Sequence, residues 1–287
     1  MIRGIITDID GVIVGEKIGF NSPFPHPDVI ESIKNIHDAG TPVTLCTGKP
    51  HYAVGKIITN CGLNNPHVTD GGAIIIDPIT HTIIRQHAID PTLVTELLKT
   101  FLDASMYVEV YTPDRYIIQK SQIRDNLTPV HAHVLQTNPT IVDDLIAEAA
   151  MHTVIKIMPV ATDETDKQRL FTLFEPFADR AVMSMGLHPI ANPHQFGLIT
   201  APGVSKRQSA IDATQSLGIP LSDYLGIGDS TSDWSFMELC GYAATLGNGS
   251  EELKKLIVSQ KSERGFVTDR SVDENGFLPI LDYFDLK

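Results

Sequence analysis

The strongest constraint on the fold is the regular alternation of short apolar segments with amphipathic ones near the start of the chain. The short apolar runs at 4–7 and 42–46 have the length of buried strands. The segments 27–40 and 51–62 carry apolar residues at helical spacing, and each ends at a glycine, as helices commonly do. Residues 67–76 add a strand with a glycine turn inside it. Strands that alternate with helices predict a parallel sheet covered on both faces.

The last third of the chain repeats this pattern. Apolar strands are predicted at 224–229 and 242–248, and helices at 205–218, 232–241 and 250–260. Because the two outer parts share one pattern, we predict that they build a single α/β domain, a Rossmann-like doubly wound parallel sheet.

The middle of the chain has a different pattern. Two strands flank a turn within 107–120, a helical stretch is predicted near 138–152, a strand at 154–160 and a helix at 166–177. This order predicts an inserted α+β module. We therefore expect a catalytic core made of residues 1–80 and 197–287 and a cap domain made of residues 81–196.

Composition excludes several classes of protein. The 287-residue chain has a net charge of −13 and no cluster of Lys and Arg, which argues against binding to nucleic acid. Its 3 scattered cysteines do not fit a disulfide framework and are typical of a reducing compartment. No segment approaches the ~20 apolar residues of a membrane-spanning helix, and none near the start resembles a signal peptide. We expect a soluble, cytoplasmic protein without nucleic-acid or membrane partners; the sequence does not indicate its oligomeric state.

Polar side chains gather where the predicted strands of the core end. They are Asp8 and Asp10 after the first strand, Thr47 and Gly48 after the second, Lys206 at the start of a helix, and Asp229 and Asp233 at and just beyond the end of the 224–229 segment. Since ligands bind beyond the carboxyl ends of strands in open α/β sheets, we expect these residues to form one site.

The two acids after the first strand indicate a metal ion. Asp8 and Asp10 are two positions apart in an extended segment, so both side chains point to the same side. Converging carboxylates repel each other unless a cation neutralises them. Together with Asp229 and Asp233 they form an all-oxygen cluster, which suits Mg²⁺ and not zinc. Mg²⁺ beside a lysine and a threonine hydroxyl is an arrangement that handles a phosphate.

The segments DIDG, TG, SK and GDSTSD resemble, in this order, the four motifs of the haloacid dehalogenase superfamily. From Thr47 to Lys206 there are 206 − 47 = 159 positions, similar to the subgroup whose α+β cap lies between the second and third motifs, the C2-capped type IIB. TGK resembles the TGR of Cof-like and sucrose-phosphatase-like members, and YAATLGNGSEELK and VTDRSVDENGFLPIL resemble the Cof-like tail. The resemblance covers both core segments and the cap only in outline.

The resemblance implies a phosphatase and a role for each motif residue. Asp8 would take the phosphoryl group as an aspartyl-phosphate, and Asp10 would protonate the leaving oxygen and then activate water. The remaining implied roles are phosphate or substrate binding by Thr47, Gly48, Lys206 and Ser232, and Mg²⁺ binding by Asp8, Asp10 through its backbone carbonyl, Asp229 and Asp233.

We therefore expect Mg²⁺-dependent hydrolysis of a small phosphate monoester, such as a sugar phosphate or a phosphorylated carboxylic acid, under a cap that closes over the site. Three alternatives remain at this point: a phosphomutase, a phosphoacceptor signalling module such as a receiver domain, and a catalytically inactive binding protein. The early position of Asp8 and the long insert disagree with the signalling module, and the intact set of acids disagrees with the binding protein. No histidine pair has the spacing of a zinc site. A cap histidine that contacts the substrate fits better, but the sequence does not single one out.

Overall fold

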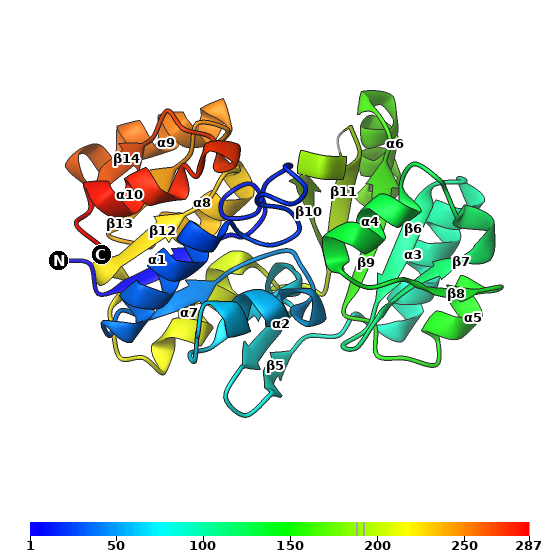
Figure 1. Ribbon diagram of the computed structural model, residues 1–287. Helices are drawn as coiled ribbons and strands as arrows, with labels where there is room; N and C mark the ends of the chain where they lie inside the picture. The colour runs from blue at the N-terminus through cyan, green and yellow to red at the C-terminus, as the bar shows by residue number, and fades with distance from the viewer. Residues whose placement is uncertain (188, 192, 287) are drawn as a thin grey trace.

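The protein is described by a computed structural model that covers residues 1–187, 189–191 and 193–286. Its two parts lie side by side in Figure 1. One part contains both ends of the chain, and the other contains the middle of the chain. The predicted ranges 81–196 and 197–287 include residues 188, 192 and 287, which lie outside the described residues.

The first part is built on a five-stranded sheet in which all neighbouring strands are parallel, in the order β14-β13-β12-β1-β2. These strands are β1 (Gly4–Thr7), β2 (Val43–Leu45), β12 (Tyr224–Ile227), β13 (Tyr242–Thr245) and β14 (Gly265–Val267). Beyond β2, a bridge between Cys46 and Val68 places β3 (His67–Thr69) alongside. From β3 the chain turns into an antiparallel sheet with β4 (Ile74–Asp77) and β5 (Thr82–Gln86).

Helices cover both faces of this sheet. On one face lie α1 (Pro27–Asp38), α2 (His51–Asn60) and α10 (Phe277–Tyr283), and on the other α7 (Lys206–Gln215), α8 (Thr231–Met237) and α9 (Glu251–Lys261). Successive side chains of β1 point to opposite faces of the sheet. Ile5 packs in the apolar cluster with α1, α2 and α10, and Ile6 packs in the cluster with α7, α8 and α9. The predicted Rossmann-like doubly wound core is therefore confirmed.

The second part, the cap, has a six-stranded sheet in the order β10-β11-β9-β6-β7-β8. Its strands are β6 (Tyr107–Tyr111), β7 (Tyr116–Gln119), β8 (Thr140–Val142), β9 (Lys156–Ala161), β10 (Val182–Leu187) and β11 (Gln195–Thr200). Three helices pack against one face, namely α3 (Pro91–Asp103), α5 (Leu145–Ala149) and α6 (Glu164–Phe174). Helix α4 (Thr128–Leu135) packs against the other face, so an α+β cap is present as predicted.

The cap sheet shows two differences from the sequence-based expectations. Residues 140–142, inside the predicted helical stretch 138–152, form strand β8, whose Thr140 pairs in parallel with Ile117 of β7. Three β-branched residues in a row favour this strand over a helix. Strand β5 pairs with β4 of the core, and all of β11 pairs within the cap sheet. We therefore propose cap limits of 87 and 200 in place of 81 and 196.

Candidate functional site

The order of the core strands locates the site. From β1 the chain moves to β2 on one side, whereas β12, β13 and β14 lie on the other side, so the direction of winding reverses between β1 and β12. Ligands of doubly wound folds bind at this reversal point, beyond the carboxyl ends of the strands. Asp8 follows β1 and Asp229 follows β12, and both line a cavity there.

Asp8 is held in place from three directions and is almost fully buried. Its backbone N–H donates to Ile227 O at 3.0 Å, Ile9 N donates to its Oδ1 at 2.7 Å, and Lys206 Nζ donates to its Oδ2 at 2.7 Å. Burial raises the pKa of Asp8 to about 7 against the opposing effect of Lys206, and the nearby Asp233 and Asp10 charges raise it further. The carboxyl therefore lies in an environment that disfavours its negative charge.

Asp233 has every side-chain oxygen occupied. Lys206 Nζ donates to its Oδ1 at 2.6 Å, while the backbone N–H groups of Asp229 and Ser230 donate to its Oδ2 at 3.1 and 3.2 Å. Although burial acts in the opposite direction, Lys206 and these N–H groups keep the pKa of Asp233 below its usual range. Asp233 is thus a fully hydrogen-bonded carboxylate at the start of α8.

Asp229 differs from Asp233 in lacking donors. Within the part of the chain that the structure describes, no side chain or backbone N–H donates to its carboxylate. Burial, Asp233 and Asp8 raise its pKa well above the usual value. One carboxylate oxygen from each of Asp8, Asp229 and Asp233 can be chosen so that all three lie within 4.8 Å of one another. This cluster of acidic oxygens could hold a metal ion.

The neighbouring glycine allows this close packing. Gly11 has φ +76°, and a Cβ at this position would lie 2.1 Å from Asp229 Oδ2. Only glycine fits both the backbone conformation and the space. Asn248, which follows β13, holds the loop that contains Gly11 in place, because its Nδ2 donates to Gly11 O at 2.8 Å. Asn248 also lines the cavity.

Asp10 has a partner that the sequence analysis missed. Lys49 Nζ donates to Asp10 Oδ1 at 2.6 Å, and the lysine side chain is almost fully buried. The Asp10 carboxylate is outside the three-carboxylate cluster described above. Lys49 directly follows Gly48, so its position inside the TGK segment was the available signal.

Thr47 and Gly48 form the loop after β2, as predicted. Thr47 is buried, its N–H donates to Val68 O at 3.0 Å, and its Oγ1 accepts from Lys49 N at 3.1 Å. A Cβ at Gly48 would lie 2.9 Å from Leu198 Cδ2 of the cap strand β11, so the Leu198 side chain would have to move to make room for it. Ser232 lines the same cavity, and its hydroxyl lies 2.8 Å from that of Ser230.

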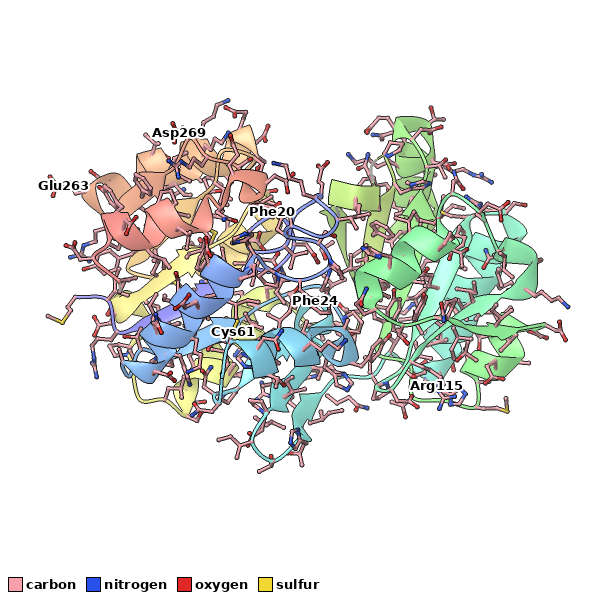
Figure 2. The ribbon with its side chains drawn as sticks, in the orientation of Figure 1. Phe20, Phe24, Cys61, Arg115, Glu263 and Asp269 are labelled. Atoms are coloured by element: carbon pink, nitrogen blue, oxygen red, sulfur yellow. The ribbon has the colours of Figure 1, made fainter. Side chains whose placement is uncertain are left out.

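The cavity lies between the core and the cap and has a volume of about 700 Å³. All of the predicted site residues except Asp233 line it. In Figure 2, Phe20 and Phe24 mark the loop between β1 and α1 on the side of the core nearest the cap, whereas Arg115 lies on the cap. The cap wall includes residues from six elements, namely Tyr111 of β6, His131, Val134 and Leu135 of α4, Lys156 and Met158 of β9, Lys167 of α6, Val182, Ser184, Met185 and Gly186 of β10, and Gln195, Phe196, Leu198 and Thr200 of β11.

Lys156 links the cap to the core. Its Nζ donates to Gly48 O at 2.9 Å, lies 3.2 Å from Asp70 Oδ1, and sits 4.1 Å from the centre of the Tyr111 ring. Burial lowers the pKa of Lys156, and Asp70 acts in the opposite direction. Asp70 also accepts from His51 N at the start of α2 at 3.3 Å. The cap therefore directly contacts Gly48, one of the residues predicted to bind phosphate or substrate.

The chain is similar in sequence to known proteins over most of its length. The profile of the haloacid dehalogenase-like hydrolase family matches residues 5–263. The chain belongs to this family. It is 24% identical to the 5-amino-6-(5-phospho-D-ribitylamino)uracil phosphatase of Bacillus subtilis over 97% of this chain and 96% of that one. It is 21% identical to the pyridoxal phosphate phosphatase of Escherichia coli over 88% of this chain and 90% of that one.

The fold agrees with this assignment. A solved sugar phosphatase of haloacid dehalogenase subclass IIB superposes with a TM-score of 0.78 at 18% identity, covering 99% of this chain and all of that chain. The predicted superfamily, the Cof-like subgroup and the predicted class of enzyme, a haloacid dehalogenase-like phosphatase, are confirmed. Within the described ranges, no helix is both long and apolar enough to cross a membrane.

Proposed function

We propose that this haloacid dehalogenase-like phosphatase uses Mg²⁺ to hydrolyse a small phosphate monoester through an aspartyl-phosphate intermediate. The observation that carries the proposal is the position of Asp8: a buried carboxylate at the end of β1, in contact with Lys206 and beside Asp229 and Asp233. A nucleophilic carboxylate divides one difficult displacement into two easier ones.

In the first half of the proposed reaction, a carboxylate oxygen of Asp8 attacks phosphorus and the bond from phosphorus to the leaving oxygen breaks. Asp10 gives its proton to that oxygen, so the leaving group departs as a neutral alcohol. In the second half, Asp10 takes a proton from water, the hydroxide attacks phosphorus, and inorganic phosphate leaves with the Asp8 carboxylate restored. Lys49, which donates to Asp10 Oδ1 at 2.6 Å, orients this acid and base.

The phosphoryl oxygens need donors, and the loops around Asp8 supply them. Lys206 reaches Asp8 from the start of α7, and Thr47 and Gly48 come from the loop after β2. We assign these three residues to phosphate binding, because preorganised donors stabilise charge that develops during transfer. Ser232 of α8, which also lines the cavity, is assigned to the substrate.

The acidic cluster fits Mg²⁺. Asp229 lies near two other carboxylates and has no hydrogen-bond donor within the described residues, so a cation would relieve the repulsion. Asp8 and Asp229 would bind the ion directly, with the backbone carbonyl of Asp10. Asp233, whose oxygens are occupied by Lys206 and by backbone N–H groups, would act through a water ligand. When bound, Mg²⁺ would neutralise the phosphate oxygens and orient the phosphorus toward Asp8.

The substrate class proposed from the sequence is a sugar phosphate or a phosphorylated carboxylic acid. The uracil-type and pyridoxal phosphatases named above act on different leaving groups, so the family alone does not select one. The side chains with which the cap lines the cavity differ in chemistry from those of the core. We assign the selection of the leaving group to these cap side chains. The 3 cysteines are free thiols, which supports the proposed cytoplasmic location.

The decisive experiment measures inorganic phosphate released from a panel of metabolite phosphates, with Mg²⁺ and with a chelator. We expect release from at least one ester with Mg²⁺, and loss of release with the chelator. Release that is unaffected by the chelator would exclude the metal. Transfer of the phosphoryl group to a second substrate molecule, without release, would indicate a phosphomutase instead.

A further inference from the structure

The cap contains a buried carboxylate that the proposed reaction does not use. Glu109 of β6 is fully buried on the face of the cap sheet that is turned toward the cavity. Tyr107 and Tyr111, two positions away on either side and hence on the same face, donate their hydroxyls to it at 2.9 and 2.7 Å. His131 Nδ1 of α4 lies 2.9 Å from Glu109 Oε1. A buried carboxylate with three partners holds those partners in fixed positions.

His131 is the member of this network that reaches the cavity with an unused polar atom. The residue is only 5% exposed, yet it lines the cavity shared with Asp8. Its ring lies between those of Tyr116 and Phe196, with centroids 5.7 and 5.0 Å away, so it cannot turn freely. Its second nitrogen, Nε2, makes no hydrogen bond to any described residue and is not fully buried. That nitrogen is therefore open to a ligand in the cavity.

Glu109 also determines what Nε2 can do. Both oxygens of Glu109 accept from tyrosine hydroxyls, so the contact with His131 favours a ring hydrogen on Nδ1. A neutral imidazole with its hydrogen on Nδ1 presents a lone pair at Nε2. A ligand group that donates, such as a hydroxyl or an N–H, is the natural partner of this lone pair.

The rest of the cap wall favours an uncharged ligand. Around His131 it presents Val134, Met158 and Phe196, which are apolar. The two cap lysines of the cavity are already paired, Lys156 with Asp70 and Lys167 with Glu164 at 3.5 Å. Among the described residues, an anionic leaving group would therefore find no unpaired lysine on this wall, while a neutral one with an apolar face would lose little by leaving water.

We propose that His131, oriented by Glu109, is the cap residue that selects the leaving group, and that the substrate is a phosphate monoester whose neutral leaving group carries a hydroxyl or N–H donor beside an apolar face. This inference rests on the proposed function. It favours phosphate esters that carry a hydroxyl group over phosphorylated carboxylic acids as substrates. His131 contacts the substrate; Glu109 acts through His131 as a positioning residue.

The test compares matched esters. Phenyl phosphate has no donor, 3- and 4-(hydroxymethyl)phenyl phosphate add a neutral donor, and 3- and 4-carboxyphenyl phosphate add a negative charge. We expect kcat/KM of the wild-type enzyme to be about tenfold higher for a hydroxymethyl ester than for phenyl phosphate, the effect of one neutral hydrogen bond, and lowest for the carboxyphenyl esters. His131→Phe keeps a ring between Tyr116 and Phe196 and should erase the preference for hydroxymethyl, chiefly through KM.

Two further variants separate positioning from general damage. Glu109→Leu removes the acceptor of Nδ1 and should also erase the hydroxymethyl preference, whereas Glu109→Gln retains an acceptor oxygen and should restore part of it. His152→Phe is the matched control: His152 is another cap histidine paired with a glutamate, Glu148 at 2.9 Å, but it does not line the cavity. It should leave the ratio between the esters unchanged.

Binding without turnover keeps the two proposals distinguishable. Dissociation constants of the same esters, measured calorimetrically on the Asp8→Asn chain with and without His131→Phe, should show the same tenfold preference and its loss. If no ester is hydrolysed but this difference is present, the hydrolytic proposal fails and the role of His131 stands. Equal affinities for the phenyl and hydroxymethyl esters, or equal effects of His131→Phe and His152→Phe, would overturn the role of His131.

Discussion

Two acidic groups, one in the cap and one in the core, differ in how their charges are neutralised. Glu109 in the cap accepts from two tyrosines and contacts one histidine. Asp229 in the core lies near two other carboxylates and has no donor within the described residues. Burying a charge is costly unless it is paired. The cap acid is paired within the protein, whereas the core acid would, under the proposed function, be neutralised by a cation from solution.

This contrast separates two tasks. A carboxylate that is fully hydrogen-bonded by its own chain fixes the geometry of its neighbours. A cluster of carboxylates that repel one another creates affinity for a cation and raises the pKa of its members, as with Asp8 and Asp229. Asp233 is intermediate, since it belongs to the cluster but is neutralised by Lys206 and backbone donors.

The largest effect should come from the core acid that we assign as the nucleophile. Asp8→Asn removes the nucleophile, so kcat should fall by about 10³-fold or more while the far-ultraviolet circular dichroism spectrum stays unchanged. The exposed Asp103→Asn, at the end of α3, is the matched control and should keep full activity. A rate near that of the wild type for Asp8→Asn would remove Asp8 from the nucleophile role.

The next effect sharpens the cap side of the comparison. Glu109→Ala leaves the Tyr107 and Tyr111 hydroxyls and a ring nitrogen of His131 without an acceptor inside the protein. We expect the free energy of unfolding, measured by urea titration, to fall by about 3 kcal/mol. Glu148→Ala removes the acceptor of the partly exposed His152 and should lower it by less than about 1 kcal/mol. Equal losses would show that the Glu109 network is no stronger than a surface pair.

The third prediction compares two acids of the core cluster. Asp229→Asn should raise the Mg²⁺ concentration needed for half-maximal activity by about 100-fold, because it removes the negative charge of a carboxylate that we assign to the metal without breaking a hydrogen bond of the fold. Asp233→Asn breaks contacts with Lys206 and with backbone N–H groups, so it should lower thermal stability as well. The contrast between Asp229 and Asp233 would fail if both variants lowered stability equally.

The smallest effect concerns pH in the absence of metal. The pKa of Asp8 rises from 3.8 to about 7 on folding, so the folded state keeps a proton that the unfolded state has lost. Stability should therefore fall as pH rises from about 4 to about 7. Asp229 acts in the same direction, whereas Asp233, with its lowered pKa, loses its contribution only at lower pH.

Thermal melts in a chelator, recorded across this pH range, test the last prediction. The decline should be smaller in Asp8→Asn and should be reversed by added Mg²⁺, because the ion neutralises the cluster. A metal-free melting temperature that rises from pH 4 to pH 7 would contradict the assigned pKa of Asp8.

The sequence predicts the core better than the cap because the core signals are local. Asp8 and Asp10 stand two positions apart beside a glycine, and the strands β1, β2 and β12 are each followed within two positions by a polar residue of the site. Parallel order then brings these strand ends to one edge of the sheet without further information. The Lys49 contact with Asp10 was harder to predict, because its partner is 39 positions away.

The cap signals are non-local. Glu109 and Lys156 each stand out as a charge within an apolar strand, which is a sign of a buried pair, but no local pattern identifies their partners His131 and Asp70. Strand β8 has only three residues, and its pairing with β7 overrides the helical pattern of its surroundings. The pattern of residues 178–200 does not predict the β10–β11 hairpin either.

The central place of β1 in the core sheet has a consequence for how the protein is made. β1 pairs on one side with β12, and contacts there join residues as far apart as Arg3 and Asp223, 220 positions along the chain. During synthesis, one edge of β1 therefore stays unpaired until the whole cap and then β12 have left the ribosome. Asp8 emerges early, but Lys206, Asp229 and Asp233 emerge late, so a nascent chain has no working site. A truncated product that ends within the cap would be an inactive chain with an exposed strand edge, and hence a target for aggregation or proteolysis.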